Sequence, residues 1–203
     1  LPFHNPVQVA EESATIDIIS NGRFSLGVGA GYQAQEFHGM GVNINDSREM
    51  FTEYLDVVMK CWEEGSITYN GDFVNINDIL VIPKPIQKPG PPVYVAVSTS
   101  PESVDKAASL GLPILVGGPT TTLGQTPAVV KLWHDRMEHY GRPHENIDLP
   151  VSANVYVAPT MEEAENDIKG LEDKINEEFY RVGNPADKNG KIPENYKHWV
   201  HRD

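Results

Sequence analysis

The chain has 203 residues, with 29 Asp or Glu and 16 Lys or Arg, which gives a formal net charge of −13. A chain of this length can bury a hydrophobic core, and its negative charge argues against anionic partners such as nucleic acids and membrane surfaces. The single cysteine, Cys61, excludes a disulfide framework and a cysteine-based metal site within this sequence. Its apolar neighbours favour a place in the core, and one unpaired cysteine fits a cytoplasmic protein.

The first predicted element is a helix over residues 6–19. Asn5 is suited to cap this helix, Pro6 occupies its first position, and Gln8 is placed to reach back to the cap. A polar turn then leads to a short apolar strand, which is predicted over residues 24–28.

A glycine-rich segment follows this strand. Residues 29–34, GAGYQA, match the G-x-G-x-x-A pattern of a dinucleotide-binding turn. Such a turn leads directly into a helix, whereas the next helix start, a capping box at residues 46–49, lies about a dozen residues later. We therefore favour another role, in which glycines at a strand end let a flat ring approach the backbone and allow positive φ in the loop. A tight barrel-corner loop without a ligand is the structural alternative.

The helix that begins near Asp46 has apolar residues at helical spacing along one face. They are Phe51, Tyr54, Leu55, Val58 and Trp62. Gly65 is expected to end the helix, and residues 67–82 alternate around Asn70-Gly71, which predicts a β-hairpin.

Strands and helices alternate after a proline-rich connection at residues 83–92. Further strands are predicted over residues 93–97, 113–117 and 151–158. Helices are predicted over about 101–110, 127–140 and 161–181. Apolar strands separated by helices indicate a parallel sheet covered on its outside. The polar tail, residues 183–203, is predicted to be a loop or an insertion.

A cluster of hydroxyl groups precedes the helix predicted at residue 101. The segment Ser98-Thr99-Ser100-Pro101-Glu102-Ser103 places serines and free backbone N–H groups at a helix N-terminus, which is a favourable place for an anion. An ordinary serine N-cap is the alternative, and Glu102 would oppose an anion unless its side chain points to solvent.

The order of these motifs resembles that of the luciferase-like flavin-dependent monooxygenases, the superfamily of bacterial luciferase. The resemblance covers about residues 1–165 and lies in the segments LPFHNPVQVAEESATIDIISNGRFSLGVGAGY, GDFVNINDILVIPKPIQKPGPPVYVAVSTSPESVDKAASLGLP and ANVYVAPTMEEAE. It implies an α/β fold, a (β/α)8 TIM barrel in a single domain over residues 1–203, of which only part is present.

The resemblance also implies the site residues. The flavin-binding residues would be Gly29, Ala30, Gly31, Tyr32, Val97, Ser98, Thr99, Ser100 and Ser103, with the FMN phosphate at the serines. Bacterial luciferase has a cysteine at the position of Gly29 and an arginine at that of Ala30, so this chain lacks an arginine that would help to hold the phosphate. His4 lies beside Asn5, where luciferase has a histidine, and is the one catalytic candidate. The histidine spacings do not predict a metal site.

The activity that the resemblance implies is oxidation of a small organic substrate, of the aldehyde or ketone type, by reduced FMN and O2. A flavin reductase would supply the reduced flavin, and a homodimer or heterodimer is compatible with the family. An F420-dependent hydride-transfer oxidoreductase and a non-catalytic flavin-binding relative are the two alternatives.

The predicted strands are too few to close a barrel. A closed barrel has eight strands and typically about 250 residues, whereas the sequence predicts four strands. We therefore expect an arc of four parallel strands with open edges. We also expect these 203 residues to be the middle of a longer chain, which has about three further strands before Leu1 and at least one after Asp203.

Overall fold

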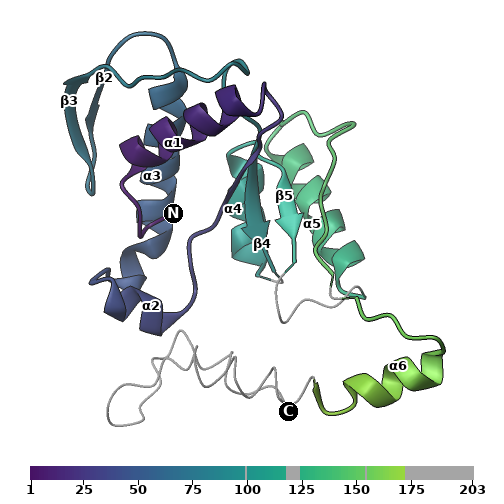
Figure 1. The fold of residues 1–203 in the computed structure, drawn as a ribbon. Helices are drawn as coiled ribbons and strands as arrows, with labels where there is room; N and C mark the ends of the chain where they lie inside the picture. The colour runs from purple at the N-terminus through teal and green to yellow at the C-terminus, as the bar shows by residue number, and fades with distance from the viewer. Residues whose placement is uncertain (99, 118–123, 154, 172–203) are drawn as a thin grey trace. The chain divides into compact units, whose positions relative to one another are not determined.

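The described residues of the computed structural model are 1–98, 100–117, 124–153 and 155–171 (Figure 1). The chain divides into two compact units, residues 1–30 with 49–153 and residues 31–48 with 154–203. The first, called the sheet unit here, holds the parallel sheet and the hairpin. The second unit holds short helical segments.

Helix α1 (Pro6–Ile19) begins as the sequence predicts. The Asn5 side chain accepts hydrogen bonds from the backbone N–H groups of Val7 (3.0 Å) and Gln8 (3.3 Å). Gln8 does not reach back to the cap, and its Nε2 instead donates to Glu12 Oε1 at 2.9 Å. The two side chains lie one turn apart on the same helix face, which makes the pairing local and easy to form.

Three parallel strands form the sheet in the order β1-β4-β5. They are β1 (Leu26–Val28), β4 (Val93–Val97) and β5 (Ile114–Val116). The strands predicted over 24–28 and 113–117 are therefore shorter than expected, and the one over 93–97 is confirmed with its bounds.

The fourth predicted strand, 151–158, is not formed. Val151 makes one parallel bridge with Val116, and the Ser152 N–H donates to the Val116 carbonyl at 2.8 Å. No ladder continues through the described residues beyond this bridge, and the side chains of Val155 and Val157 are 81% and 83% exposed. The prediction fails because a strand needs a neighbouring strand for its hydrogen bonds, which its own sequence does not supply.

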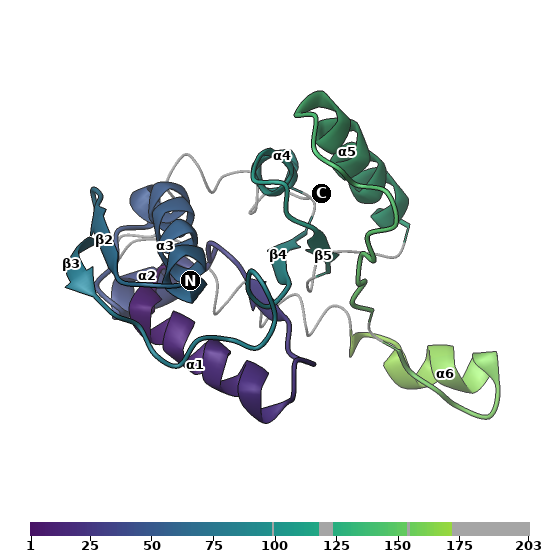
Figure 2. The same ribbon diagram turned by 90° about the horizontal axis from the view of Figure 1, so that it is seen from above.

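Helices α4 (Pro101–Ser109) and α5 (Thr126–His139) lie on the same side of β4 and β5 (Figure 2). The buried residues between them and the strands are Val93, Val95, Val97, Val104, Ala107, Ala108, Ile114, Val116, Val129, Trp133 and Met137. The indole N–H of Trp133 donates to the Leu112 carbonyl at 3.0 Å, so the largest side chain of this core keeps its polar group paired. The sheet is thus covered on one face by helices, as predicted.

Helix α3 (Ser47–Trp62) packs with α1 through the core. Trp62 donates its indole N–H to the Ala10 carbonyl at 3.2 Å. Cys61 is 1% exposed, which confirms its predicted place in the core. Burial raises the pKa of its thiol, so the thiol is kept protonated and unreactive.

The predicted hairpin forms from β2 (Ile67–Asn70) and β3 (Asn75–Ile79). Its turn is longer than the predicted Asn70-Gly71 turn and occupies residues 71–74. The carboxylate of Glu53 on α3 accepts from the N–H groups of Asp72 (3.0 Å), Phe73 (3.0 Å) and Val74 (2.7 Å). A tertiary contact therefore stabilises the longer turn, and this contact is not visible in the local sequence.

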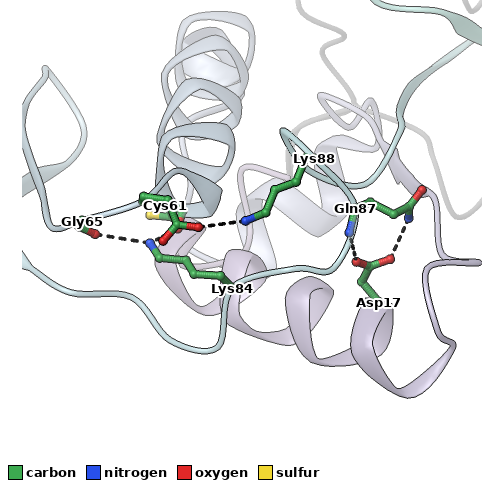
Figure 3. Close-up of polar contacts among 7 residues, drawn as sticks. Asp17, Cys61, Gly65, Lys84, Gln87 and Lys88 are labelled. Atoms are coloured by element: carbon green, nitrogen blue, oxygen red, sulfur yellow. Dashed lines mark hydrogen bonds and ion pairs between the residues drawn. The ribbon is translucent and has the colours of Figure 1, made fainter.

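The proline-rich connection between β3 and β4 is fixed at two places (Figure 3). The buried Asp17 carboxylate of α1 accepts from Gln87 N–H (2.9 Å) and Gln87 Nε2 (2.6 Å), and Nε2 also donates to the Phe24 carbonyl (2.8 Å). Lys84 donates to the carbonyl groups of Cys61 (2.9 Å) and Gly65 (3.3 Å), at the end of α3. The connection therefore joins the ends of α1 and α3 to the segments that precede β1 and β4.

The second unit contains α2 (Ala34–Gly39), the 3-10 helix η1 (Ile44–Asp46) and α6 (Met161–Ile168). Helix α2 contradicts the expectation that the next helix starts at the capping box of residues 46–49. It begins at Ala34, the last residue of the G-x-G-x-x-A pattern, so the distance to the next helix does not argue against a dinucleotide-binding turn. Its N-cap makes no side-chain hydrogen bond, so the usual start signal is missing. Helix α6 ends at Ile168, and residues 169–170 form a turn within the helix predicted over 161–181. Residues 172–181 and the tail 183–203 lie outside the described residues.

Candidate functional site

The carboxyl ends of the parallel strands meet at one edge of the sheet. This edge carries Gly29 and Ala30 after β1, Ser98 after β4 and Gly117 after β5. Ligands of parallel α/β folds bind at this end, because the loops there vary while the sheet holds their ends in place.

The glycine-rich segment begins on the sheet face opposite α4 and α5. A Cβ at Gly29 would lie 3.8 Å from the Cβ of Ala96, so both positions face the same side. Gly31 has φ +80°, which confirms the positive φ expected in this loop. Four consecutive residues, Gly29 to Tyr32, are predicted to contact the flavin ring. Gly29 and Ala30 belong to the sheet unit, whereas Gly31 and Tyr32 belong to the second unit.

The serine cluster forms at the N-terminus of α4. Ser100 caps the helix, its Oγ accepting from the Ser103 N–H (3.4 Å) and lying 3.3 Å from Ser103 Oγ. The Ser100 hydroxyl donates to the Glu102 carboxylate at 2.7 Å. The carboxylate therefore occupies the hydrogen-bonding position that the sequence assigns to a phosphate oxygen, and a bound phosphate requires Glu102 to turn away.

The remaining predicted flavin-binding residues, Val97, Ser98 and Thr99, differ in what they can offer. The Val97 side chain is buried on the helix-covered face, and its carbonyl accepts from the Gly117 N–H at 3.0 Å. The Val97 side chain therefore offers no hydrogen-bond donor to a ligand, and the Val97 carbonyl pairs β4 with the end of β5. Ser98 is partly exposed at that edge, and Thr99 lies outside the described residues.

His4 lies in a groove of about 910 Å³ between the start of α1, α3 and the hairpin. Tyr54, Phe73 and Ile76 line this groove with it, and none of the predicted flavin residues does. The groove therefore gives His4 an environment distinct from that of the glycines and serines.

Sequence reasoning missed a set of residues on the sheet face opposite α4 and α5. The strand register places Gly27 beside Tyr94 and Ala96 beside Leu115, on the face opposite the buried valines. The period-two spacing of Gly27 with Gly29 and of Tyr94 with Ala96 was the available signal. It could not be read without knowing which face the helices cover.

The described helices contain none that is both long and apolar enough to cross a bilayer.

Comparison with known proteins places these features in one family. A family model described as luciferase-like monooxygenase matches residues 1–202. The 4-hydroxyprotoasukamycin monooxygenase of Streptomyces nodosus subsp. asukaensis is 29% identical over 191 residues, which cover 91% of this chain and 52% of that protein. The alkanal monooxygenase alpha chain of Photorhabdus luminescens is 28% identical over 148 residues, covering 73% of this chain and 40% of that protein. This chain therefore spans about half, or less, of the length of these relatives.

Solved structures share the fold at low sequence identity. The monooxygenase RslO1 from Streptomyces bottropensis has a TM-score of 0.77 at 24% identity and covers 90% of this chain and 56% of its own. The oxygenating constituent of 3,6-diketocamphane monooxygenase from Pseudomonas putida, in complex with FMN, has a TM-score of 0.73 at 19% identity, covering 95% and 58%. The parallel sheet with its outer helices corresponds to part of the TIM barrel of these proteins. The chain belongs to the luciferase-like monooxygenase family.

Proposed function

We propose that this chain carries the flavin site of a monooxygenase that uses reduced FMN and O2 to oxidise a small organic substrate of the aldehyde or ketone type. The observation that carries the proposal is the shared sheet edge, which brings Gly29, directly after β1, and the Ser100 cap of α4, after β4, to neighbouring strand ends in a chain of this family. Binding of FMN by the structurally similar oxygenating constituent supports the choice of cofactor.

The residues at this edge fit the two ends of FMN. Ser100, Ser103 and the first N–H groups of α4 would hold the phosphate, because a helix N-terminus attracts an anion. Gly29 carries no side chain where a Cβ would lie 3.8 Å from the Ala96 Cβ, which would let a planar ring approach the backbone of Gly29 closely. Bound reduced FMN supplies the reaction with O2, and the chain contributes position, orientation and exclusion of water.

Glu102 sets a condition on this arrangement. Its carboxylate is held by Ser100 and carries the same sign of charge as a phosphate. Since the Glu102 side chain is exposed, it can turn to solvent, which frees the Ser100 hydroxyl for the phosphate.

A second candidate is an F420-dependent oxidoreductase that transfers a hydride and needs no O2. The F420-dependent secondary alcohol dehydrogenase shares the fold, with a TM-score of 0.71 at 20% identity, covering 90% of this chain and 56% of its own.

Titration of the full chain with FMN, with riboflavin and with F420 tests the phosphate site. Ser100→Asp places a second carboxylate at the N-terminus of α4, and we expect it to weaken FMN binding roughly tenfold while riboflavin binding stays unchanged. Ser25→Asp adds the same charge at an exposed position before β1 and serves as the control. Equal FMN affinity in both variants contradicts the phosphate site.

Oxygen uptake separates the candidate functions. Reduced FMN with a panel of aldehydes and ketones is expected to give oxidised product and O2 consumption. In the cell, a flavin reductase would provide the reduced FMN. Reduction of F420 by an alcohol without O2 uptake would favour the second candidate, and tight FMN binding without turnover would identify a non-catalytic flavin-binding protein.

A further inference from the structure

The two faces of the sheet differ in what covers them. Val93, Val95 and Val97 of β4 point to the helices and are buried, whereas Ala96 is exposed and Tyr94 is partly exposed. The neighbouring positions on this second face are Gly27, Gly29 and Leu115. This face therefore presents little side-chain bulk along β1.

No described part of the chain requires a glycine at position 27 in β1 or at position 29, directly after this strand. Neither Gly27 nor Gly29 has a positive φ. A Cβ at Gly27 would meet nothing within 4 Å, and one at Gly29 would make an ordinary contact with Ala96 at 3.8 Å. Glycine weakens a strand interior, where a β-branched residue is preferred. Gly27 is such a strand glycine, and together with Gly29 directly after β1 it leaves this face without side chains at these two positions, which indicates space kept for something outside the described chain.

Gly117, at the end of β5, gives a contrast within the same sheet. A Cβ there would lie 2.6 Å from the Cβ of Ser152, so the chain itself requires a glycine at that position. A Cβ therefore has room at Gly27 but not at Gly117, so the two glycines have different reasons to be glycine.

Tyr94 borders the open space. It pairs with Gly27 in the register and lies on the same face. Among the described strand residues of that face, it is the one whose side chain carries a polar group. A phenol can pack its ring edge against a planar ligand and donate its O–H to a polar atom of that ligand.

We infer that Gly27 and Gly29 form a shelf on which the planar ring of the cofactor lies, and that Tyr94 is a positioning residue at the edge of this ring. The inference rests on the proposed function and deepens it, because it extends the site from the Gly29 loop down the strand. The ligand class is a planar heteroaromatic ring with a polar edge, which both FMN and F420 contain.

Gly27→Val tests the shelf. Valine suits a strand and meets no atom of the described chain, so the melting temperature is expected to stay equal or to rise. Its side chain would occupy the ring space, so FMN and riboflavin are both expected to bind at least tenfold more weakly. Unchanged affinity for both ligands overturns the inference, and so does a loss of stability, because the space would then be filled by the chain itself.

Gly117→Ala provides the matched control for that measurement. Its added Cβ conflicts with Ser152, so a lower melting temperature is expected for this variant. Opposite effects of the two substitutions on stability support the distinction between a glycine kept for a ligand and one required by packing. A Gly117→Ala chain as stable as the unmodified one overturns the distinction.

Tyr94→Phe tests the positioning role. Loss of one hydrogen bond to the ring is expected to weaken FMN and riboflavin binding by roughly fivefold each and to shift the absorption band of the bound flavin. Tyr140→Phe is the control, because the Tyr140 hydroxyl bonds Asp105 at 3.0 Å on the surface. Identical spectra and affinities in the two variants overturn the role of Tyr94.

The outcomes separate this inference from the proposed function. An unmodified chain that binds FMN but is indifferent to Gly27→Val and Tyr94→Phe overturns the shelf and leaves the phosphate site standing. A chain that binds none of FMN, riboflavin and F420 overturns both proposals.

Discussion

The side chain of Asp17 joins α1 to the proline-rich connection. Its carboxylate is 0% exposed and accepts hydrogen bonds from the backbone and the side chain of Gln87. Burial alone would raise the pKa of Asp17, but the hydrogen bonds from Gln87 and from the Ile86 backbone hold it below its usual value. The ionised form is therefore the one that the fold stabilises.

Asp17→Asn is expected to lower the free energy of unfolding at pH 7 by about 1–3 kcal/mol, because an amide N–H₂ group would face the Gln87 donors. Since the folded-state pKa is depressed, the stabilisation is present above the usual aspartate pKa of about 4 and is lost as the pH falls through the lower folded-state value. Urea unfolding at pH 7 and at about pH 3 is expected to show a difference that shrinks with acid.

The surface carboxylate of Asp135 is the control for this experiment. It pairs with Lys131 at 2.6 Å one helical turn away, and the two side chains are 55% and 75% exposed. Asp135→Asn is expected to change stability by no more than about 0.5 kcal/mol at either pH. A difference for Asp17→Asn that stays constant with pH contradicts the role of its charge.

At the scale of elements, the hairpin depends on α3 through one side chain. Glu53 accepts three backbone N–H groups of the turn, and bonds to an ionised acceptor are stronger than neutral ones. A Cβ at Gly71 would collide with the Glu53 carboxylate, so a larger residue at this position would displace the carboxylate from the turn.

Glu53→Gln is expected to loosen the turn, because an amide has one acceptor oxygen and no charge. The expected cost is about 1–3 kcal/mol. Hydrogen exchange is expected to speed up at Asp72, Phe73 and Val74 and to change little in α1. Glu49→Gln, at an exposed position of the same helix, should leave these amides unchanged. Equal protection in both variants would show that the strands, not Glu53, hold the turn.

At the scale of the whole molecule, the charge is strongly unbalanced. The chain has 29 acidic and 16 basic side chains. Partly or largely exposed groups form the ion pairs Lys60–Asp56, Lys88–Glu64, Lys131–Asp135 and Arg136–Asp105. Surface pairs of this kind contribute little, so mutual repulsion of the carboxylates is not offset locally.

Added salt is therefore expected to raise the melting temperature. Between about 0.01 M and about 0.15 M ionic strength the screening length falls from roughly 30 Å to roughly 8 Å, which weakens the repulsion between distant carboxylates. Thermal unfolding of the full chain in sodium chloride measures this. A melting temperature that falls with salt would show that attractive pairs dominate instead.

The sequence predicts best those features that depend on neighbouring residues in the chain. The Asn5 cap with Pro6 fixes the start of α1, and the apolar run at 93–97 gives β4 with its bounds. It predicts less where the outcome depends on distant partners. The strand over 151–158 lacks a neighbour beyond Val151, and the uncapped helix α2 gives no local start signal.

The candidate site follows the same division. The serine cap of α4 could be read from Ser100-Pro101, because capping is local. The sequence indicates that the Glu102 charge opposes an anion at this helix start, but it does not predict the hydrogen bond between Ser100 and Glu102. Gly27 and Tyr94 could not be assigned to the site, because their shared face depends on which side α4 and α5 cover.

The tie among Asp17, Gln87 and Phe24 bears on how this protein can change during evolution. It lies before the first residues of β1 and β4, and the Leu26 N–H bonds the Pro92 carbonyl at 2.8 Å close by. The strands are thus aligned at their amino ends, whereas Gly29 and Ser100 follow their carboxyl ends. Substitutions that alter ligand preference can accumulate at one end while the residues that align the strands stay untouched at the other. Selection can therefore act on chemistry and on folding through different residues.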